Sequence, residues 1–263
     1  MKVYFAILSA QFRILLQYRA AAWAGFGTQL FWGLIRITIF TAFYQSTKQA
    51  QPISQENIVT YLWLIQGLFA LTMWGFDLDV RQMIRDGTVA YEMLRPIDLY
   101  WLWFSRAVAA RIAPTVLRSL PLVIFAGLFF GLQLPASCGA FCAFLFSLVG
   151  ASLIVAGFSV LLTTTLIRTI AADGIARLGV ALTLVLSGMS IPIPLMPEKV
   201  QFFVNLLPFR NIIDSPIRLY MGHIPLRDCW QVFLHEAVWV AILVLWGRWF
   251  LSRTQQHLVV QGG

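Results

Sequence analysis

Long apolar stretches alternate with short polar ones along this 263-residue chain, and the alternation predicts helices that cross a membrane. The 49 residues from Ser119 to Ile167 contain no Asp, Glu, Lys or Arg. A helix needs about 20 apolar residues to cross a bilayer, so this run holds two spans, joined by a turn at residues 131–135. The whole pattern predicts six spans: Ala20–Phe43, Ile58–Gly75, Ala107–Phe130, Ala140–Leu166, Leu178–Ile191 and Val232–Trp249.

The first nineteen residues show a different periodicity. Their polar and small side chains recur on one side of a helix, and large apolar side chains occupy the other side. This pattern predicts an amphipathic helix over residues 1–19 that lies in the membrane interface rather than across it. The first stripe holds Lys2, Ala6, Ser9, Arg13 and Gln17, and the second holds Tyr4, Phe5, Leu8, Phe12, Leu15 and Leu16.

A charged segment, residues 77–98, separates the second predicted span from the third. It holds eight of the thirty formal charges of the chain, and its apolar residues recur at helical spacing. Gly87 interrupts this pattern and Pro96 ends it, so we expect two short amphipathic helices, Asp77–Asp86 and Thr88–Arg95. A structured charged segment between two spans indicates a docking surface for a soluble partner. The alternative is a solvated loop whose arginines only fix the topology.

A proline-rich segment, residues 192–228, precedes the last span. Val200–Leu207 and Asn211–Tyr220 have the length of short helices, and prolines and Gly222 interrupt them. Irregular backbone at membrane depth persists only where protein or a water cavity satisfies its polar groups. We therefore expect a re-entrant helical hairpin here, with an ordinary interfacial loop as the alternative.

The amino-acid composition narrows the class of protein further. The chain is 59% hydrophobic and only 11% charged, and its mean hydropathy is +0.78. Soluble domains carry roughly 25% charged residues, so a water-soluble globule is excluded. The net charge of +8 does not indicate nucleic-acid binding, because the basic residues lie at the ends of apolar stretches. Eleven lie on the side of the termini and five on the other side, which predicts cytoplasmic termini and a cytoplasmic charged segment.

Several ionisable residues fall inside or beside the predicted spans. Arg36 lies within the first span, while Arg111, Thr115 and Arg118 share one face of the third. Intramembrane charge is costly and usually faces a cavity or a partner, so Arg36, Thr115 and Arg118 are candidates for a translocation path. Snorkelling to lipid phosphates is the alternative, above all for Arg111. We expect His235 and Glu236 to lie in the interface at the outer end of the last span.

Known catalytic and metal-binding patterns are missing from the sequence. No Gly-Lys dipeptide occurs, so there is no Walker A phosphate loop, and neither HExxH nor GxSxG is present. The three cysteines match neither a disulfide framework nor a zinc site, although a bridge between Cys138 and Cys229 stays open. We therefore expect no catalytic residue, no metal site and no cofactor bound by this chain.

The order of these parts resembles the permease subunit of type-2 ATP-binding-cassette exporters, in the branch of small bacterial permeases. The resemblance covers the whole chain as a single permease domain, residues 1–263. Its most specific pieces are the run from Arg85 to Pro96 and the later groups Leu186-Ser-Gly, Leu206-Leu-Pro-Phe209, Ser215-Pro216 and Gly222. It implies an all-α integral membrane protein with six transmembrane helices, coupling helices after the second span and a re-entrant hairpin before the sixth.

The resemblance also implies partners and a mechanism. A second permease, identical or related, would complete the membrane unit, and separate nucleotide-binding ATPase subunits would hold ATP and Mg. The substrate would be a drug, a peptide or a lipid-like molecule moved out of the cytoplasm. The alternatives are a non-transporting membrane scaffold or assembly factor, and an energy-independent channel. The residues implied in ATPase coupling are Arg81, Arg85, Asp86, Gly87, Glu92 and Arg95, with Arg168 and Asp173 as a second contact.

Overall fold

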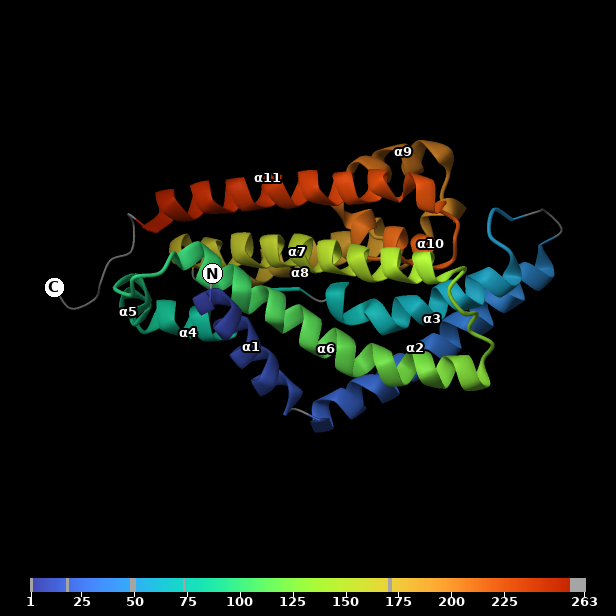
Figure 1. Ribbon diagram of the computed structural model, residues 1–263, viewed down its shortest axis with the longest axis horizontal. Helices are drawn as coiled ribbons and strands as arrows, with labels where there is room; N and C mark the ends of the chain where they lie inside the picture. Colours follow the sequence, from blue (N-terminus) through green and yellow to red (C-terminus); the bar gives the residue numbers. More distant parts are fainter. Residues whose placement is uncertain (1, 18, 48–50, 73, 170–171, 256–263) are drawn as a thin grey trace.

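The computed structural model describes residues 2–17, 19–47, 51–72, 74–169 and 172–255, and every regular element in these ranges is helical (Figure 1). The α-helices are α1 Lys2–Leu16, α2 Arg19–Ser46, α3 Gln55–Thr72, α4 Leu78–Arg85, α5 Val89–Met93, α6 Leu99–Phe129, α7 Cys138–Arg168, α8 Asp173–Leu186, α9 Glu198–Leu206, α10 Asp214–Tyr220 and α11 Cys229–Gln255. Short 3-10 helices cover Ile193–Leu195 (η1), Pro208–Ile212 (η2) and Leu226–Asp228 (η3).

Within the described ranges, four helical segments are long and apolar enough to cross a membrane. They are Trp23–Ser46, Leu99–Phe129, Cys138–Arg168 and Leu226–Gln255. The helices α3 and α8, which correspond to the second and fifth predicted spans, do not meet this standard. The first turn of α3 is polar, and α8 has only 14 residues. Six membrane crossings therefore stay a prediction, whereas an all-helical, multi-pass membrane protein agrees with the structure.

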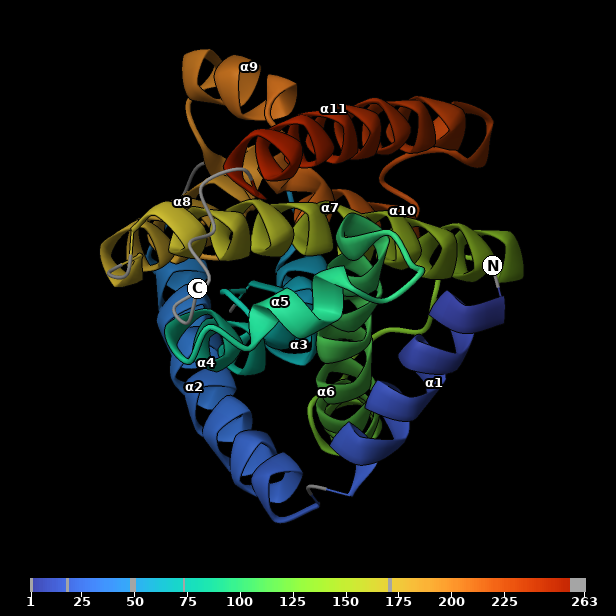
Figure 2. The same ribbon diagram turned by 90° about the vertical axis from the view of Figure 1, so that its left-hand side faces the viewer.

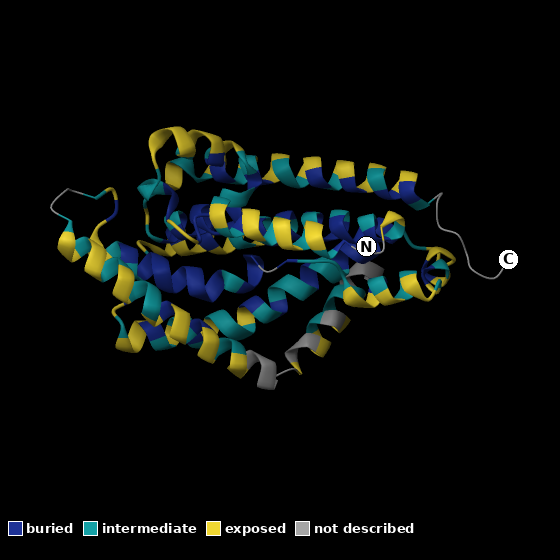
Figure 3. Cartoon of the chain, turned by 180° about the vertical axis from the view of Figure 1, so that it is seen from behind, coloured by how far each residue is buried: buried dark blue, intermediate teal, exposed yellow. Residues whose placement is uncertain are grey.

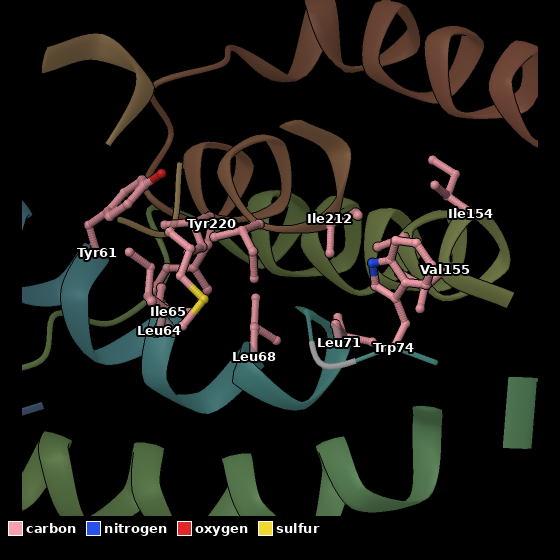
Figure 4. Packing of buried hydrophobic residues seen from close by; sticks show 14 of the residues in the cluster. Tyr61, Leu64, Ile65, Leu68, Leu71, Trp74, Ile154, Val155, Ile212 and Tyr220 are labelled. Carbon is pink, nitrogen blue, oxygen red and sulfur yellow. The ribbon is translucent and has the colours of Figure 1, made fainter. Parts of the chain in front are cut away.

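The central position of α3 explains its composition. Tyr61, Trp63 and Ile65 are completely buried, and α3 packs between α2 and α6. Its side chains meet those of α7 and of the proline-rich segment, such as Ile154 and Ile212, in the main core (Figure 4). A helix surrounded by protein rather than lipid can carry polar side chains in its buried surface, as α3 does with Gln66.

The helices form layers when the molecule is viewed end-on (Figure 2). The α11 helix lies above α7 and α8, α3 and α6 lie below them, and α1 and α2 converge at the base. The long axis has two distinct ends (Figure 1). At the charged end lie α4, α5, the start of α6 and the last turns of α7 and α11; at the proline-rich end lie α9, α10 and η2.

Exposed residues lie along the outer faces of the long helices (Figure 3), and many of them are large and apolar. Trp32 on α2, Leu128 on α6 and Leu245 on α11 are each more than half exposed. Water disfavours such a surface, whereas lipid tails accept it. The exposed apolar faces therefore agree with a bilayer around the molecule.

Several boundaries differ from the predicted ones for identifiable reasons. The helix α6 begins eight residues before Ala107, because the Asp98 side chain caps it by accepting from the Trp101 N–H at 3.1 Å. The prolines at 114 and 121 lie inside this helix without ending it. The helix α8 ends at Leu186 rather than Ile191, because Gly188 turns the chain with φ +84°.

The remaining predicted elements match the structure closely. The helices α4 and α5 lie within the predicted 77–86 and 88–95, and α9, η2 and α10 account for the two short helices of the proline-rich segment. Residues 2–16 form the predicted N-terminal helix, which packs on α6 through Ile7 and Leu8. Cys138 and Cys229 are free, so no bridge joins them.

Candidate functional site

The charged segment is built around Asp77, which connects three helices. Its side chain caps α4 by accepting from the backbone N–H groups of Asp79 at 2.9 Å and Val80 at 3.2 Å. The Arg106 guanidinium of α6 donates to the two Asp77 carboxylate oxygens at 2.7 and 3.1 Å. The Asp77 backbone N–H donates to Thr163 Oγ1 on α7 at 3.1 Å. The start of α4 is therefore attached to two of the long apolar helices.

A second ion pair attaches α4 to α8. The Arg81 guanidinium donates in a bidentate arrangement to Asp173, with distances of 3.1 Å to Oδ1 and 2.8 Å to Oδ2. Asp173 is the first residue of α8, where a carboxylate is favoured by the helix dipole. The Arg81 guanidinium also lies 4.7 Å from the centre of the Phe76 ring. Two residues that the resemblance assigns to separate contacts with an ATPase thus bind each other.

The turn between α4 and α5 requires glycine. Gly87 has φ +71°, a left-handed conformation that side chains with a Cβ rarely adopt. The reversal directs Val80 of α4 and Val89 of α5 into one apolar cluster at the start of α6, where both are buried. The two short helices are thus seated on α6 by their apolar faces, as their periodicity predicts.

Glu92 lies on the inner side of this pair of helices. It is buried, and its Oε2 accepts from the Trp103 indole N–H of α6 at 2.9 Å. A buried carboxylate with a protein partner is not part of the outer surface. The structure therefore gives Glu92 a role in seating α5 on α6.

The outer face of α4 and α5 combines charged and apolar side chains. Arg85, Asp86 and Arg95 are exposed, and so are Tyr91 and Leu94, at 70% and 81%. Such a mixture of charges with exposed aromatic and aliphatic groups is typical of surfaces that bind another protein. We call this face the coupling surface, defined by Leu78, Arg85, Asp86, Tyr91, Leu94 and Arg95.

The residues predicted for a translocation path each have a contact within the protein. The Arg36 guanidinium donates to the backbone carbonyl of Met189 at 2.6 Å, beside the turn that ends α8. Thr115 is buried and donates to the carbonyl of Arg111 in its own helix at 2.7 Å. Arg118 lies against Gly25 of α2, where an added Cβ would be 2.6 Å from Arg118 Nε. These contacts do not test whether the three side chains line a common path, so the translocation path stays a prediction.

A network of buried polar groups at the proline-rich end was not anticipated from the sequence. The Tyr61 hydroxyl donates to Asp214 Oδ1 at 2.8 Å, and both side chains are almost completely buried. The backbone N–H of Asp214 donates to the Ser187 carbonyl at 3.1 Å. These contacts attach α10 to α3 and to the end of α8. An acid in a stretch as apolar as residues 211–221 is the sequence signal that could have indicated a buried partner.

The acidic residue of the last helix is also buried. Glu236 is 3% exposed and accepts from the Ser147 hydroxyl of α7, so the prediction of an interfacial side chain is wrong. The reason is Gly150 of α7, which has no side chain and leaves room for the Glu236 carboxyl group. The neighbouring His235 is half-buried, and its Nδ1 forms a hydrogen bond of 2.7 Å with the Asn211 amide.

His223 lies in the loop after α10 and forms a 3.1 Å hydrogen bond with the Asn57 amide. Partial burial and the nearby Arg218 guanidinium lower the pKa of this histidine. The neutral ring is therefore favoured in the folded protein, and the loop holds the start of α3 through an uncharged contact.

Comparison with known proteins assigns the chain to one class. A family model described as ABC-2 family transporter protein matches residues 30–262. No curated protein and no solved structure shows significant similarity to the chain. The matched range includes both the coupling surface and the proline-rich segment.

Proposed function

This chain belongs to the ABC-2 family of transporter proteins, and from that membership we propose that it is the membrane-spanning permease subunit of an ATP-driven exporter. It crosses the inner membrane six times with α2, α3, α6, α7, α8 and α11, and both termini and the charged end face the cytoplasm. A separate ATPase holds ATP and Mg, and a second permease, identical or related, completes the membrane unit. The substrate is an amphipathic drug, peptide or lipid-like molecule.

The observation that carries this proposal is the attachment of α4. Arg106 and Thr163 connect the start of α4 to α6 and α7, and Asp173 connects its middle to α8. A displacement of α4 by a partner is therefore transmitted to α6, α7 and α8 at once. An ATPase that binds the coupling surface differently with and without ATP would shift the population of inward-open and outward-open arrangements.

The residues of the coupling segment divide into two groups. Arg85, Asp86 and Arg95 point outward and contact the ATPase. Arg81, Asp173 and Glu92 position the two short helices, since their partners lie within this chain. Gly87 sets the angle between α4 and α5. Arg168 lines a cavity between helices rather than the coupling surface.

Charge reversal on the coupling surface tests the proposal. The double variant Arg85→Glu with Arg95→Glu is co-expressed with the Walker A protein expected in an adjacent reading frame. We expect co-purification of the ATPase to fall at least roughly tenfold, because two attractive contacts at a protein interface become repulsive. Nucleotide hydrolysis by the assembled complex falls with it.

The matched control is Arg227→Glu, an exposed arginine in η3 at the proline-rich end. It makes the same kind of charge change on the other side of the membrane and should leave the complex intact. If neither variant affects co-purification while the ATPase binds the wild type, the coupling surface is wrong. If no ATPase binds the wild-type permease, a membrane scaffold becomes the better interpretation.

A further inference from the structure

A cavity of 770 Å³ lies between α7, α8 and α11, apart from the coupling surface. Its lining is mainly apolar and aromatic, from Phe158 and Leu161 on α7 to Trp246 and Trp249 on α11. Two arginines, Arg168 and Arg253, also line it. The volume is within the range of about 300–1,000 Å³ that is usual for small-molecule sites.

The apolar and basic residues are ordered along the cavity in the same direction on both long helices. On α7, Phe158 comes first and Arg168 ten residues later; on α11, Trp246 comes first and Arg253 seven residues later. Both helices run from the proline-rich end to the charged end, so their arginines lie at the same end of the cavity (Figure 1). The cavity is therefore apolar toward the middle of the two helices and basic toward the charged end.

The length of the lined surface matches one leaflet of a bilayer. Ten residues of helix from Phe158 to Arg168 span about 15 Å, which is half of the roughly 30 Å hydrocarbon thickness. Trp246 and Trp249 line the cavity and are both more than half exposed, so this wall of the cavity is open to the surroundings of the helices. An exposed apolar wall of this length favours a lipid chain over water.

The basic end of the cavity has no carboxylate partner in the part of the chain that the structure describes. Among the described residues, no carboxylate lies within 4.0 Å of Arg168 or Arg253. The Arg168 guanidinium is exposed and lies 5.5 Å from the centre of the Phe250 ring, which orients it. Arginine is well suited to a phosphate group because its planar donors can bind two oxygens at once.

We propose that this cavity binds an anionic phospholipid of the leaflet at the charged end. An acyl chain lies along Phe158, Leu161 and Trp246, and the headgroup phosphate lies between Arg168 and Arg253. The occupant is a lipid rather than a soluble anion because most of the lining is apolar and its tryptophan wall is exposed. The site does not depend on the proposed function, since it needs neither an ATPase nor a transported substrate.

Lipid titration of the purified full-length chain, followed by native mass spectrometry, tests this site. The probes are phosphatidylglycerol and phosphatidylcholine with the same acyl chains. The double variant Arg168→Gln with Arg253→Gln should weaken phosphatidylglycerol binding by roughly thirtyfold, the effect of about two basic groups near an anionic lipid. Phosphatidylcholine binding should change little, because its headgroup is neutral overall.

Three further variants distinguish the effect of the arginine charges from the effects of cavity shape and of misfolding. Arg168→Lys with Arg253→Lys keeps the charges and should retain most of the selectivity for phosphatidylglycerol. Arg177→Gln removes an exposed arginine at the same end that does not line the cavity, and should have no effect. Ile175→Trp adds bulk in the cavity wall on α8 and should weaken both lipids, while thermal melting in detergent checks that each variant is folded.

Specific outcomes would overturn the proposal. Equal affinity of the wild type for the two lipids would show that the arginines do not select an anionic headgroup. Full displacement of phosphatidylglycerol by millimolar inorganic phosphate would indicate an anion site without a lipid chain. If Ile175→Trp altered the number of subunits but not lipid binding, the cavity would be a contact with a second copy instead.

Discussion

The two ends of this molecule differ in how far the polar pairs that connect their helices are exposed. At the charged end, the connecting ion pairs are partly exposed: the Arg81 and Asp173 side chains are 20% and 49% exposed. At the proline-rich end, the connecting pair of Tyr61 and Asp214 is 0% and 1% exposed. Exposed pairs contribute about 0–1 kcal/mol and can re-form in a new geometry, whereas a buried group that loses its partner is costly.

This difference indicates which end can move. Helix α4 is held by contacts that tolerate displacement, and it carries an outer surface suited to a partner. The proline-rich segment is held by buried contacts from α10 to α3 and to the end of α8. We therefore expect the charged end to act as the mobile part and the proline-rich end as the fixed part during transport.

Removal of the buried carboxylate should have the largest effect. Asp214→Leu leaves the Tyr61 hydroxyl without its acceptor inside the protein and removes the 3.7 Å ion pair with Arg218. We expect a loss of stability of about 3 kcal/mol, measured by thermal and denaturant unfolding in detergent. Tyr61→Phe, which removes the donor instead, should cost less. Near-normal stability of Asp214→Leu would contradict the idea of a fixed end.

Two glycines in the same backbone conformation allow a matched comparison of the ends. Gly188 has φ +84° and Gly87 has φ +71°, so alanine costs about 1–2 kcal/mol of backbone strain at either position. An added Cβ at Gly188 would lie 2.7 Å from the Tyr61 hydroxyl oxygen, whereas at Gly87 no atom lies within 4 Å. Gly188→Ala should therefore lower the melting temperature clearly more than Gly87→Ala does. Equal losses would show that the surroundings of Gly188 can adapt.

A double-mutant cycle on Arg81 and Asp173 should show the smallest effect on stability. With one side chain half exposed, we expect a coupling energy of about 0.2–1 kcal/mol. Both single variants should nevertheless reduce ATPase coupling, because α4 loses its contact with α8. A coupling energy of several kcal/mol would show that this end is as rigid as the other.

The sequence allowed most of the fold to be predicted, for reasons visible in particular residues. The charge-free run from Ser119 to Ile167 predicted two long helices, and the structure has α6 and α7 there. Gly87 and Pro96 predicted the two short helices of the charged segment, since backbone conformation at these residues depends on local chemistry. Helix boundaries were less predictable, because Asp98 caps α6 through a contact that hydrophobicity does not reveal.

The candidate site was predictable in part. The exposed positions of Arg85, Asp86 and Arg95 agree with an outward role, as their place in an amphipathic pattern suggested. Glu92 lies in the same pattern but points to Trp103, and Arg36 binds the Met189 carbonyl 153 residues away. Residue type and spacing do not specify partners that are distant along the chain.

The sequence by itself determined the membrane class, the helical content and the place of the charged segment, because these depend on transfer of residues from water to lipid and on local periodicity. Only the tertiary structure decided which charges bind each other and which are buried. It joined Arg81 to Asp173, enclosed Asp214 beside Tyr61, and placed Arg168 and Arg253 in the lining of one cavity. The reason is that each of these contacts depends on how separate helices pack, and helix packing is a property of the whole chain.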